Sequence, residues 1–194
     1  MPEGFGLSFA GTYADYRYTS DAQGVMNAEN GSFEDVAETV KTKDLKISAG
    51  PQLAANFTID YMHPKMWFAD ISINYYDNNY LDFSPNRFRE SNVAKYTTPE
   101  MVAAFGTQEK LPAGFMLDAS IGKLLYLKNS QSLSINLSLN NVLNNKKMIT
   151  GGYQQARLPL DTSDQIDATA LNRFANKYYY ASGFNFFLNI GFKF

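Results

Sequence analysis

The sequence predicts an all-β fold, specifically an antiparallel segment of a transmembrane β-barrel with about six up-and-down strands. Three observations support this prediction. Apolar and polar residues alternate strictly in six segments of the 194-residue chain, and this places successive side chains on opposite faces of a sheet. The links between the segments are alternately very short and very long. The segments are also longer than the strands of most soluble domains.

The six expected strands follow one another along the chain, and no segment shows a convincing helical pattern. The last segment has the clearest alternation, with Phe186, Leu188, Ile190 and Phe192 on one face and Asn185, Asn189, Gly191 and Lys193 on the other. The first segment blurs near its end, where charged residues take over the apolar positions. We expect strands at about 5–18, 53–61, 67–75, 115–121, 133–139 and 184–194.

The connections favour a membrane barrel. Tight turns are expected at 62–65 and 128–131, whereas the links at about 19–42, 82–112 and 144–182 are long and polar. Structureless loops of more than about 12–15 residues are uncommon in compact soluble domains. Short turns on one side and long loops on the other are typical of outer-membrane barrels.

Alternation alone leaves two interpretations open, because the apolar face could be the core of a soluble β-sandwich or the lipid-facing side of a barrel. The lengths of the strands favour the barrel, since a tilted strand needs about 10 residues to cross an apolar band about 25 Å tall. Aromatic residues also gather near the strand ends, as in the interfacial girdles of barrels. They are Tyr61, Trp67, Phe192 and Phe194 near the short turns, and Tyr75, Tyr80 and 178–180 near the long links.

Six strands cannot enclose a polar lumen, and an open sheet edge is unstable in lipid. The first residues also lack the pattern of a secretory signal peptide. We therefore expect residues 1–194 to be the C-terminal segment of a larger barrel in the bacterial outer membrane, with a signal peptide and other domains outside this chain.

Several function classes receive no support. A net charge of −2 gives no electrostatic indication of a nucleic-acid partner, and no run of 18 apolar residues suggests a membrane helix. The chain has no cysteine, and its one histidine, His63, falls in a short turn. No catalytic or nucleotide-binding motif is present, so we expect no enzymatic activity, cofactor or metal. The acidic residues of the first long link (Asp21, Glu29, Glu34, Asp35 and Glu38) lack the spacing of a calcium loop, and Asp60, Asp70 and Asp118 are expected to line a wet lumen.

The sequence resembles the C-terminal region of TonB-dependent outer-membrane receptors of the Bacteroidota type, the SusC-like group that carries a carboxypeptidase-like regulatory domain. Two runs near the C-terminus resemble it most: 137–153, which includes Leu-Ser-Leu-Asn-Asn-Val-Leu-Asn-Asn-Lys and Ile-Thr-Gly-Gly-Tyr, and 177–189, Lys-Tyr-Tyr-Tyr-Ala-Ser-Gly-Phe-Asn-Phe-Phe-Leu-Asn. Segments 24–31, 63–68 and 107–111 are also similar.

The resemblance implies a 22-stranded barrel with an N-terminal plug domain, which takes up a nutrient such as a glycan, peptide, siderophore or vitamin. Its implied partners are outer-membrane lipid, the barrel-assembly machinery, the TonB complex through the missing N-terminal part, and a surface lipoprotein. The last strand resembles the β-signal that the assembly machinery recognises, with Phe184, Phe186, Leu188, Ile190, Phe192 and Phe194 as its apolar residues. From their polar and aromatic character, the candidate ligand contacts in the long links are Tyr153, Gln154, Gln155, Arg157, Asn172 and Tyr178.

Overall fold

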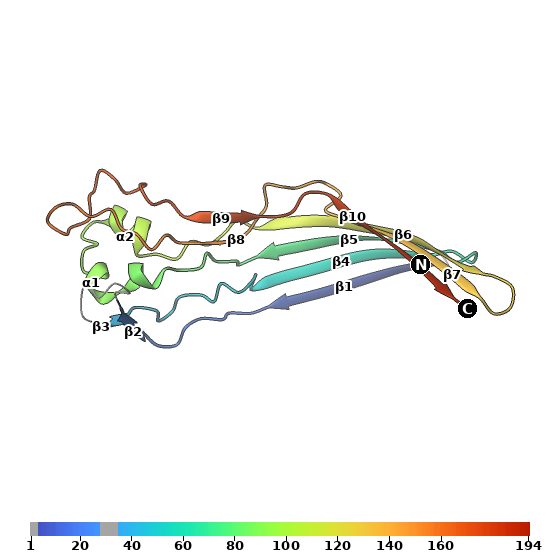
Figure 1. Cartoon of the computed structure of the whole chain (residues 1–194), viewed down its shortest axis with the longest axis horizontal. Coiled ribbons are helices and arrows are strands. Elements are labelled where there is room, and N and C mark those ends of the chain that lie inside the picture. Colours follow the sequence, from blue (N-terminus) through green and yellow to red (C-terminus); the bar gives the residue numbers. More distant parts are fainter. Residues whose placement is uncertain (1–3, 28–34) are drawn as a thin grey trace.

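A computed structural model of the chain describes residues 4–27 and 35–194. Its main element is a six-stranded antiparallel sheet in the order β1-β4-β5-β6-β7-β10 (Figure 1). The strands are β1 (Phe5–Tyr13), β4 (Leu53–Met62), β5 (Trp67–Asp77), β6 (Gly114–Tyr126), β7 (Ser132–Asn140) and β10 (Asn185–Lys193). The prediction of an all-β antiparallel fold with six main strands is confirmed. These strands form an open sheet, and within the described residues they do not close into a barrel.

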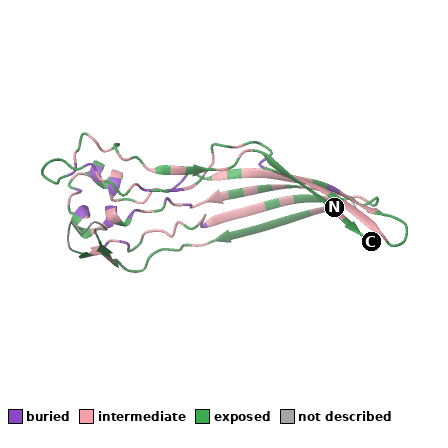
Figure 2. Cartoon of the chain, viewed as in Figure 1, coloured by how far each residue is buried: buried purple, intermediate pink, exposed green. Residues whose placement is uncertain are grey.

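The strand register unites the apolar residues on one face of the sheet, which we call the apolar face. One row of directly paired residues crosses all six strands: Leu7, Ile59, Ile71, Ala119, Leu139 and Phe186. These side chains do not form a buried core, because Leu7, Ile71 and Phe186 are 53%, 52% and 67% exposed (Figure 2). Most apolar residues of the sheet therefore form an exposed coat on one side of it, whereas Phe68, Met116 and Phe187 lie on the other side.

The opposite, polar face carries hydrogen-bonded side chains that connect neighbouring strands. Asn56 on β4 donates to Asn74 on β5 over 2.9 Å, and Asn74 donates to Asp118 on β6 over 2.8 Å. A neighbouring row of paired residues on the same face contains two carboxylates, since Asp60 lies opposite Asp70. Asp70 accepts a hydrogen bond from Ser120 on its other side. The three aspartates thus share one face, as the alternation predicted.

The three long connections contain further strands and helices, and the expectation that the chain has no helix is wrong. The first contains the hairpin of β2 (Ala22–Met26) and β3 (Val36–Val40). The second contains the 3-10 helix η1 (Pro85–Phe88) and the helices α1 (Glu90–Val93) and α2 (Pro99–Phe105). The third contains β8 (Ile149–Tyr153) and β9 (Lys177–Tyr180), which pair with each other. Strand β1 also ends at Tyr13, five residues before the predicted boundary.

All three connections extend from the same end of the sheet, opposite the two tight turns (Figure 1). The buried apolar residues lie in these connections and not in the sheet, and Figure 2 shows most of the buried positions at this end of the molecule. Among the described residues, no helix has the length and apolarity needed to span a membrane. The molecule therefore consists of an exposed sheet and a packed assembly of loops, and the buried apolar and polar side chains are concentrated in the loops.

Candidate functional site

The loop assembly, as we call the three connections 14–52, 78–113 and 141–184, has a small hydrophobic core of its own. Tyr96, Met101, Phe105 and Ile166 are buried together, so the second and third connections share this core. Helix α2 supplies two of the four residues. It begins at a Thr98 N-cap, whose hydroxyl accepts a hydrogen bond from the Met101 N–H over 3.3 Å, and Pro99 occupies its first turn. The second and third connections are therefore packed against each other.

A buried arginine joins the second connection to the third. Arg87 is only 1% exposed, and its guanidinium donates to the carbonyl of Phe174 over 2.9 Å and to Asn176 Oδ1 over 3.3 Å. It also lies 5.2 Å from the centre of the Phe105 ring. Burial lowers the pKa of Arg87 from its ordinary value. None of these contacts is a carboxylate. The buried charge of the guanidinium is therefore stabilised by the carbonyl and amide oxygens and by the Phe105 ring that the folded chain places around it.

The same network continues to a carboxylate through neutral groups. Asn176 donates to Glu109 over 2.8 Å, and the Tyr178 hydroxyl donates to both oxygens of Glu109 over 3.0 and 2.9 Å. Tyr96 closes the other side by donating its hydroxyl to the Arg87 carbonyl over 2.6 Å. Burial raises the pKa of Tyr96 to about 12, so this hydroxyl keeps its proton and remains a donor even above the ordinary tyrosine pKa of 10.0.

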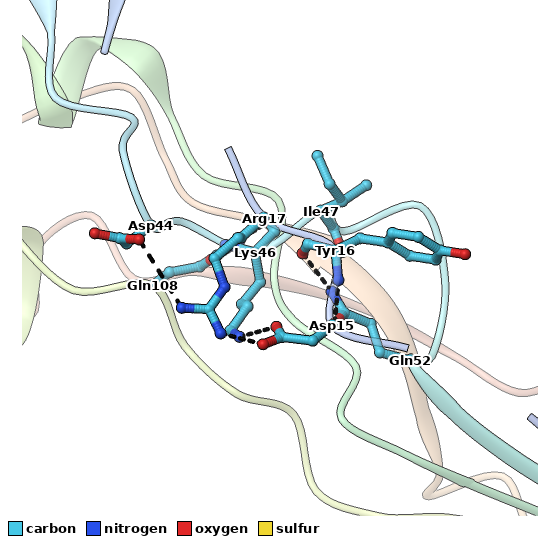
Figure 3. A network of polar contacts seen from close by, with 8 residues as sticks. All are labelled: Asp15, Tyr16, Arg17, Asp44, Lys46, Ile47, Gln52 and Gln108. Atoms are coloured by element: carbon cyan, nitrogen blue, oxygen red, sulfur yellow. Dashed lines mark hydrogen bonds and ion pairs between the residues drawn. The ribbon is translucent and has the colours of Figure 1, made fainter. Parts of the chain in front are cut away.

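Three glutamines hold backbone segments of the loop assembly together, Gln52 within the first connection and Gln108 and Gln154 between two connections. Gln52 accepts from the Tyr16 N–H and donates back to its carbonyl, and Gln108 does the same with Lys46 (Figure 3). Gln154 accepts from the Ser84 N–H over 3.2 Å and donates to the Thr107 carbonyl over 2.8 Å. Each side-chain amide therefore replaces a backbone group where two segments do not form a regular ladder. We call Gln52, Gln108 and Gln154 the glutamine clamps.

Charged residues surround the first clamp. Asp15 contacts both Arg17 and Lys46, and Arg17 also lies 3.9 Å from Asp44 (Figure 3). The hydrogen bonds from Arg17 and then from Lys46 hold the pKa of Asp15 below its ordinary range. These groups are partly exposed, so the network contributes little to stability. Its effect is to align the chain after β1 with the segment that precedes β4.

The β2–β3 hairpin is attached to the second connection by an ion pair. Arg89 contacts Glu38, and both side chains are largely buried, at 16% and 14% exposed. Glu38 also accepts a hydrogen bond from the Ser91 N–H. Although burial works to raise it, these hydrogen bonds and the Arg89 charge lower the pKa of Glu38. The hairpin is thereby fixed beside η1 and α1.

An asparagine cluster, made of Asn140, Asn141, Asn144 and Asn145, fixes the start of β10. Asn141 donates to the Ser182 carbonyl over 2.7 Å, and its Oδ1 accepts from the Asn145 N–H over 2.9 Å. Asn144 accepts from the Phe184 N–H over 3.0 Å. Asn141 and Asn144 have positive φ angles of 50° and 52°, a conformation that asparagine adopts more readily than most residues. The asparagine-rich run at 140–145 thus has a structural role here.

The six candidate ligand contacts do not gather in one place. Gln154 is a buried clamp, and Tyr178 is tied to Glu109, as described above. Tyr153 is 41% exposed and lies beside Tyr179, with ring centres 6.1 Å apart. Arg157 is exposed above the ring of Phe174, Asn172 is exposed on the segment that follows Ile166, and Gln155 is half-buried next to the clamp. Tyr153, Arg157 and Asn172 are thus the candidates with free surface.

The apolar residues of the suggested β-signal lie where the alternation placed them. Phe186, Leu188, Ile190 and Phe192 belong to β10 and pair with Leu139, Leu137, Ile135 and Leu133 of β7 on the apolar face. Phe184 precedes the strand and Phe194 follows it, with Phe194 95% exposed and its ring 6.3 Å from that of Phe192. Within the described residues, β10 forms one edge of the sheet.

The remaining titratable candidates are engaged in ordinary structural contacts. His63 lies in the β4–β5 turn, where its Nδ1 accepts a hydrogen bond from the Lys65 N–H over 3.0 Å. Of the acidic residues in the first connection, Asp21 accepts from the Lys43 N–H over 3.0 Å, while Glu29 and Glu34 lie outside the described residues. In the described part of the chain, no three His, Asp or Glu side chains are grouped so that they could hold a metal ion.

Sequence reasoning missed Arg87, Gln52 and Gln108, because their partners are distant in the chain and no local pattern reveals them. It also missed α2, although the signal is present: Thr98 and Pro99 are followed by apolar residues four positions apart at 101 and 105. Comparison with known proteins yields no match for this chain, whether among family models, curated proteins or solved structures.

Proposed function

We propose that the chain forms part of the wall of an outer-membrane β-barrel and that the barrel is a TonB-dependent nutrient receptor. The observation that carries the proposal is the exposed apolar face, which continues through directly paired residues across six strands. An exposed apolar surface of this extent is rare on soluble proteins and indicates contact with a partner or a membrane. Lipid fits best, because the opposite face is polar and hydrogen-bonded, as a water-filled lumen requires.

The geometry of the strands and connections supports the same proposal. Strands β4, β5 and β6 have 10, 11 and 13 residues, enough to cross the apolar band of an outer membrane when tilted. The turns β4–β5 and β6–β7 are short, whereas the packed connections all extend from the other end. In this orientation the loop assembly faces the outside of the cell and receives the ligand. The two open edges, β1 and β10, pair with further strands of the barrel.

The family assignment within this proposal rests on the asparagine-rich run and the C-terminal strand. In the complete receptor, β10 is the strand that the barrel-assembly machinery recognises, through its alternating apolar residues and its available edge. Energy from TonB reaches the receptor through a plug domain outside this chain. A soluble β-sandwich module is the alternative, and it requires a second layer over the apolar face.

Two neighbouring residues on β5 test the proposal. Ile73 lies on the apolar face, and Asn74 lies on the polar face within the hydrogen-bonded chain. The chain has no cysteine, so Ile73→Cys and Asn74→Cys each create a single reactive thiol in this segment. In outer membranes, we expect a water-soluble maleimide to label Asn74→Cys but not Ile73→Cys. A photoreactive apolar reagent dissolved in the membrane should label the peptide around position 73 on the Ile73 side only.

The two reagents together separate the barrel from the sandwich. In a sandwich, the thiol at position 73 also escapes the maleimide, but the membrane-dissolved reagent does not reach it. A protein that fractionates as soluble and remains unlabelled by the membrane reagent would refute the proposal. Detection by mass spectrometry of the tryptic peptide 66–87 restricts the measurement to this strand.

A further inference from the structure

The polar face contains a recess at the point where the third connection returns toward the sheet. It has a volume of about 400 Å³ and lies between strands β6 and β7 and the segment that links β9 to β10. Its lining includes Asp118 of β6, Asn140 of β7 and Asn185 of β10 from the sheet, together with Tyr180, the last residue of β9. We call it the Asp118 recess. It is distinct from the exposed loop residues considered above as ligand contacts.

Asp118 supplies a fixed negative charge in this recess. Its Oδ1 accepts from the Asn141 N–H and its Oδ2 accepts from Asn74, both over 2.8 Å. Both donors are neutral, so they hold the carboxylate in place without cancelling its charge. Among the described residues, no lysine or arginine lies within ion-pair distance of Asp118.

Within the six strands, the polar face carries little positive charge to offset Asp118, while the third connection places Lys146 beside Gly183, next to the recess. By strand register, this face of the six strands carries Asp60, Asp70 and Asp118, and its one cationic residue is Lys193. Lys193 pairs with Ser132 at the short-turn end, about eight residues along the sheet from Asp118, or roughly 26 Å. This exceeds the Debye length of about 8 Å at physiological ionic strength, so the charge of Lys193 is screened.

A smaller, apolar hollow adjoins the Asp118 recess and shares Met116 and Thr150 with it. Its volume is about 190 Å³, and its lining includes Tyr76 and Met148. Met148 lies directly over the sheet, since a Cβ added to Gly114 would come within 2.7 Å of Met148 Cγ. Gly114 therefore leaves the space that Met148 fills, and the methionine forms one wall of the hollow.

We propose that these two adjoining cavities bind a cationic amine that carries an apolar group. The ammonium occupies the Asp118 recess, where the carboxylate neutralises it and the Asn140, Asn185 and Tyr180 side chains surround it. The apolar group occupies the hollow beside Met116 and Met148. An anionic ligand is disfavoured, because it would meet the Asp118 carboxylate, which among the described residues has no lysine or arginine within ion-pair distance. As a statement about cargo this rests on the proposed function, whereas the cavities are formed by this chain alone.

Three probes with the same apolar group and different charge test the proposal: phenethylamine, 2-phenylethanol and phenylacetate. Isothermal titration of the purified protein in detergent solution should show binding of phenethylamine, weaker binding of the alcohol, and no binding of phenylacetate. Asp118→Asn should weaken phenethylamine binding by about tenfold or more and leave the alcohol unchanged. Asp60→Asn is the matched control, because Asp60 shares the polar face but does not line the recess.

A second variant keeps the test decisive if Asp118→Asn folds poorly. Ser182 lines the recess and is exposed, so Ser182→Asp should fold and adds a second carboxylate to the recess. We expect it to strengthen phenethylamine binding without strengthening that of the alcohol. Equal affinities for the amine and the alcohol in every variant, or tighter binding of phenylacetate, would overturn the proposal. Because the titration does not involve membrane insertion, its failure is distinguishable from failure of the labelling test.

Discussion

Replacing Leu137 by arginine tests which medium lies against the apolar face. Leu137 is on β7, between Ile121 of β6 and Leu188 of β10. It is four residues from Leu133 at the short-turn end, which is about 13 Å along the strand and about 10 Å along the axis of a barrel with strands tilted by about 40°. In the proposed barrel, whose apolar band is about 25 Å tall, Leu137 would lie near the middle of the bilayer.

The expected cost of Leu137→Arg is therefore about 2–4 kcal/mol, the range for a cation on the lipid face near the midplane. Leu133→Arg is the depth control and should cost about 0–1 kcal/mol, because it lies near the interface. Asn136→Lys is the control for facing and should cost far less than Leu137→Arg, since Asn136 lies on the polar face opposite Gly122 and Asn189.

The free energies of unfolding are measured by urea titration of the complete receptor folded into phospholipid vesicles. Heat-modifiable migration on gels provides a second readout of the folded fraction. Equal costs for Leu137→Arg and Asn136→Lys would refute the assignment of faces. Equal costs for the arginine at positions 137 and 133 would refute lipid as the surrounding medium, because the core of a sandwich has no such dependence on depth.

Three further predictions concern single residues. Gly152→Ala should destabilise the β8–β9 pair by about 2–4 kcal/mol, because the φ of Gly152 is 149° and a Cβ there would lie 2.0 Å from the Lys177 carbonyl oxygen. Gly151→Ala is the control, since a Cβ at that position makes only an ordinary contact. The rate of limited proteolysis of the loop assembly measures the difference between the two variants. The pKa of Tyr96 is raised to about 12, so its contribution to the free energy of unfolding is complete below pH 10 and is lost as the pH rises toward 12. The tyrosinate absorbance of the protein minus that of Tyr96→Phe should show a titration with a midpoint near 12. A midpoint near 10 would contradict this prediction. Deletion of Phe194 should lower the yield of assembled barrel in the outer membrane, and an unchanged yield of heat-modifiable receptor would exclude a role in the assembly signal.

The sheet could be predicted from the sequence because its signal is local. Each strand repeats with a period of two, so Ile71 and Ile73 are assigned to one face without knowledge of any partner. The end of β1 was harder to predict from the sequence. Asp15 and Arg17 interrupt the alternation, and the structure shows that they belong to a polar network with Lys46 in place of the ladder.

The loop assembly could not be predicted in the same way. Its helices have four and seven residues, too few for an amphipathic period to be recognised. Its contacts connect residues that are distant in sequence, such as Arg87 with Asn176 and Gln108 with Lys46. The composition of these links is polar, yet a handful of apolar side chains, separated by tens of residues, suffices for a core. The polar composition suggested exposed loops, whereas Arg87, Gln52 and Gln154 are polar residues that are buried in the packed assembly.

The glutamine clamps have a consequence for how these loops can vary in sequence. A clamp needs one donor and one acceptor on the same side chain, and at neutral pH a glutamate has no donor to offer. The isosteric exchange of Gln108 or Gln154 for glutamate would therefore break the shape of the loops, while exposed positions such as Asn172 are free to change. Since an amide carries no charge, the clamps also hold in dilute and in concentrated salt. The loop assembly thus combines hydrogen bonds that do not depend on salt concentration with exposed positions whose residues can be exchanged one at a time.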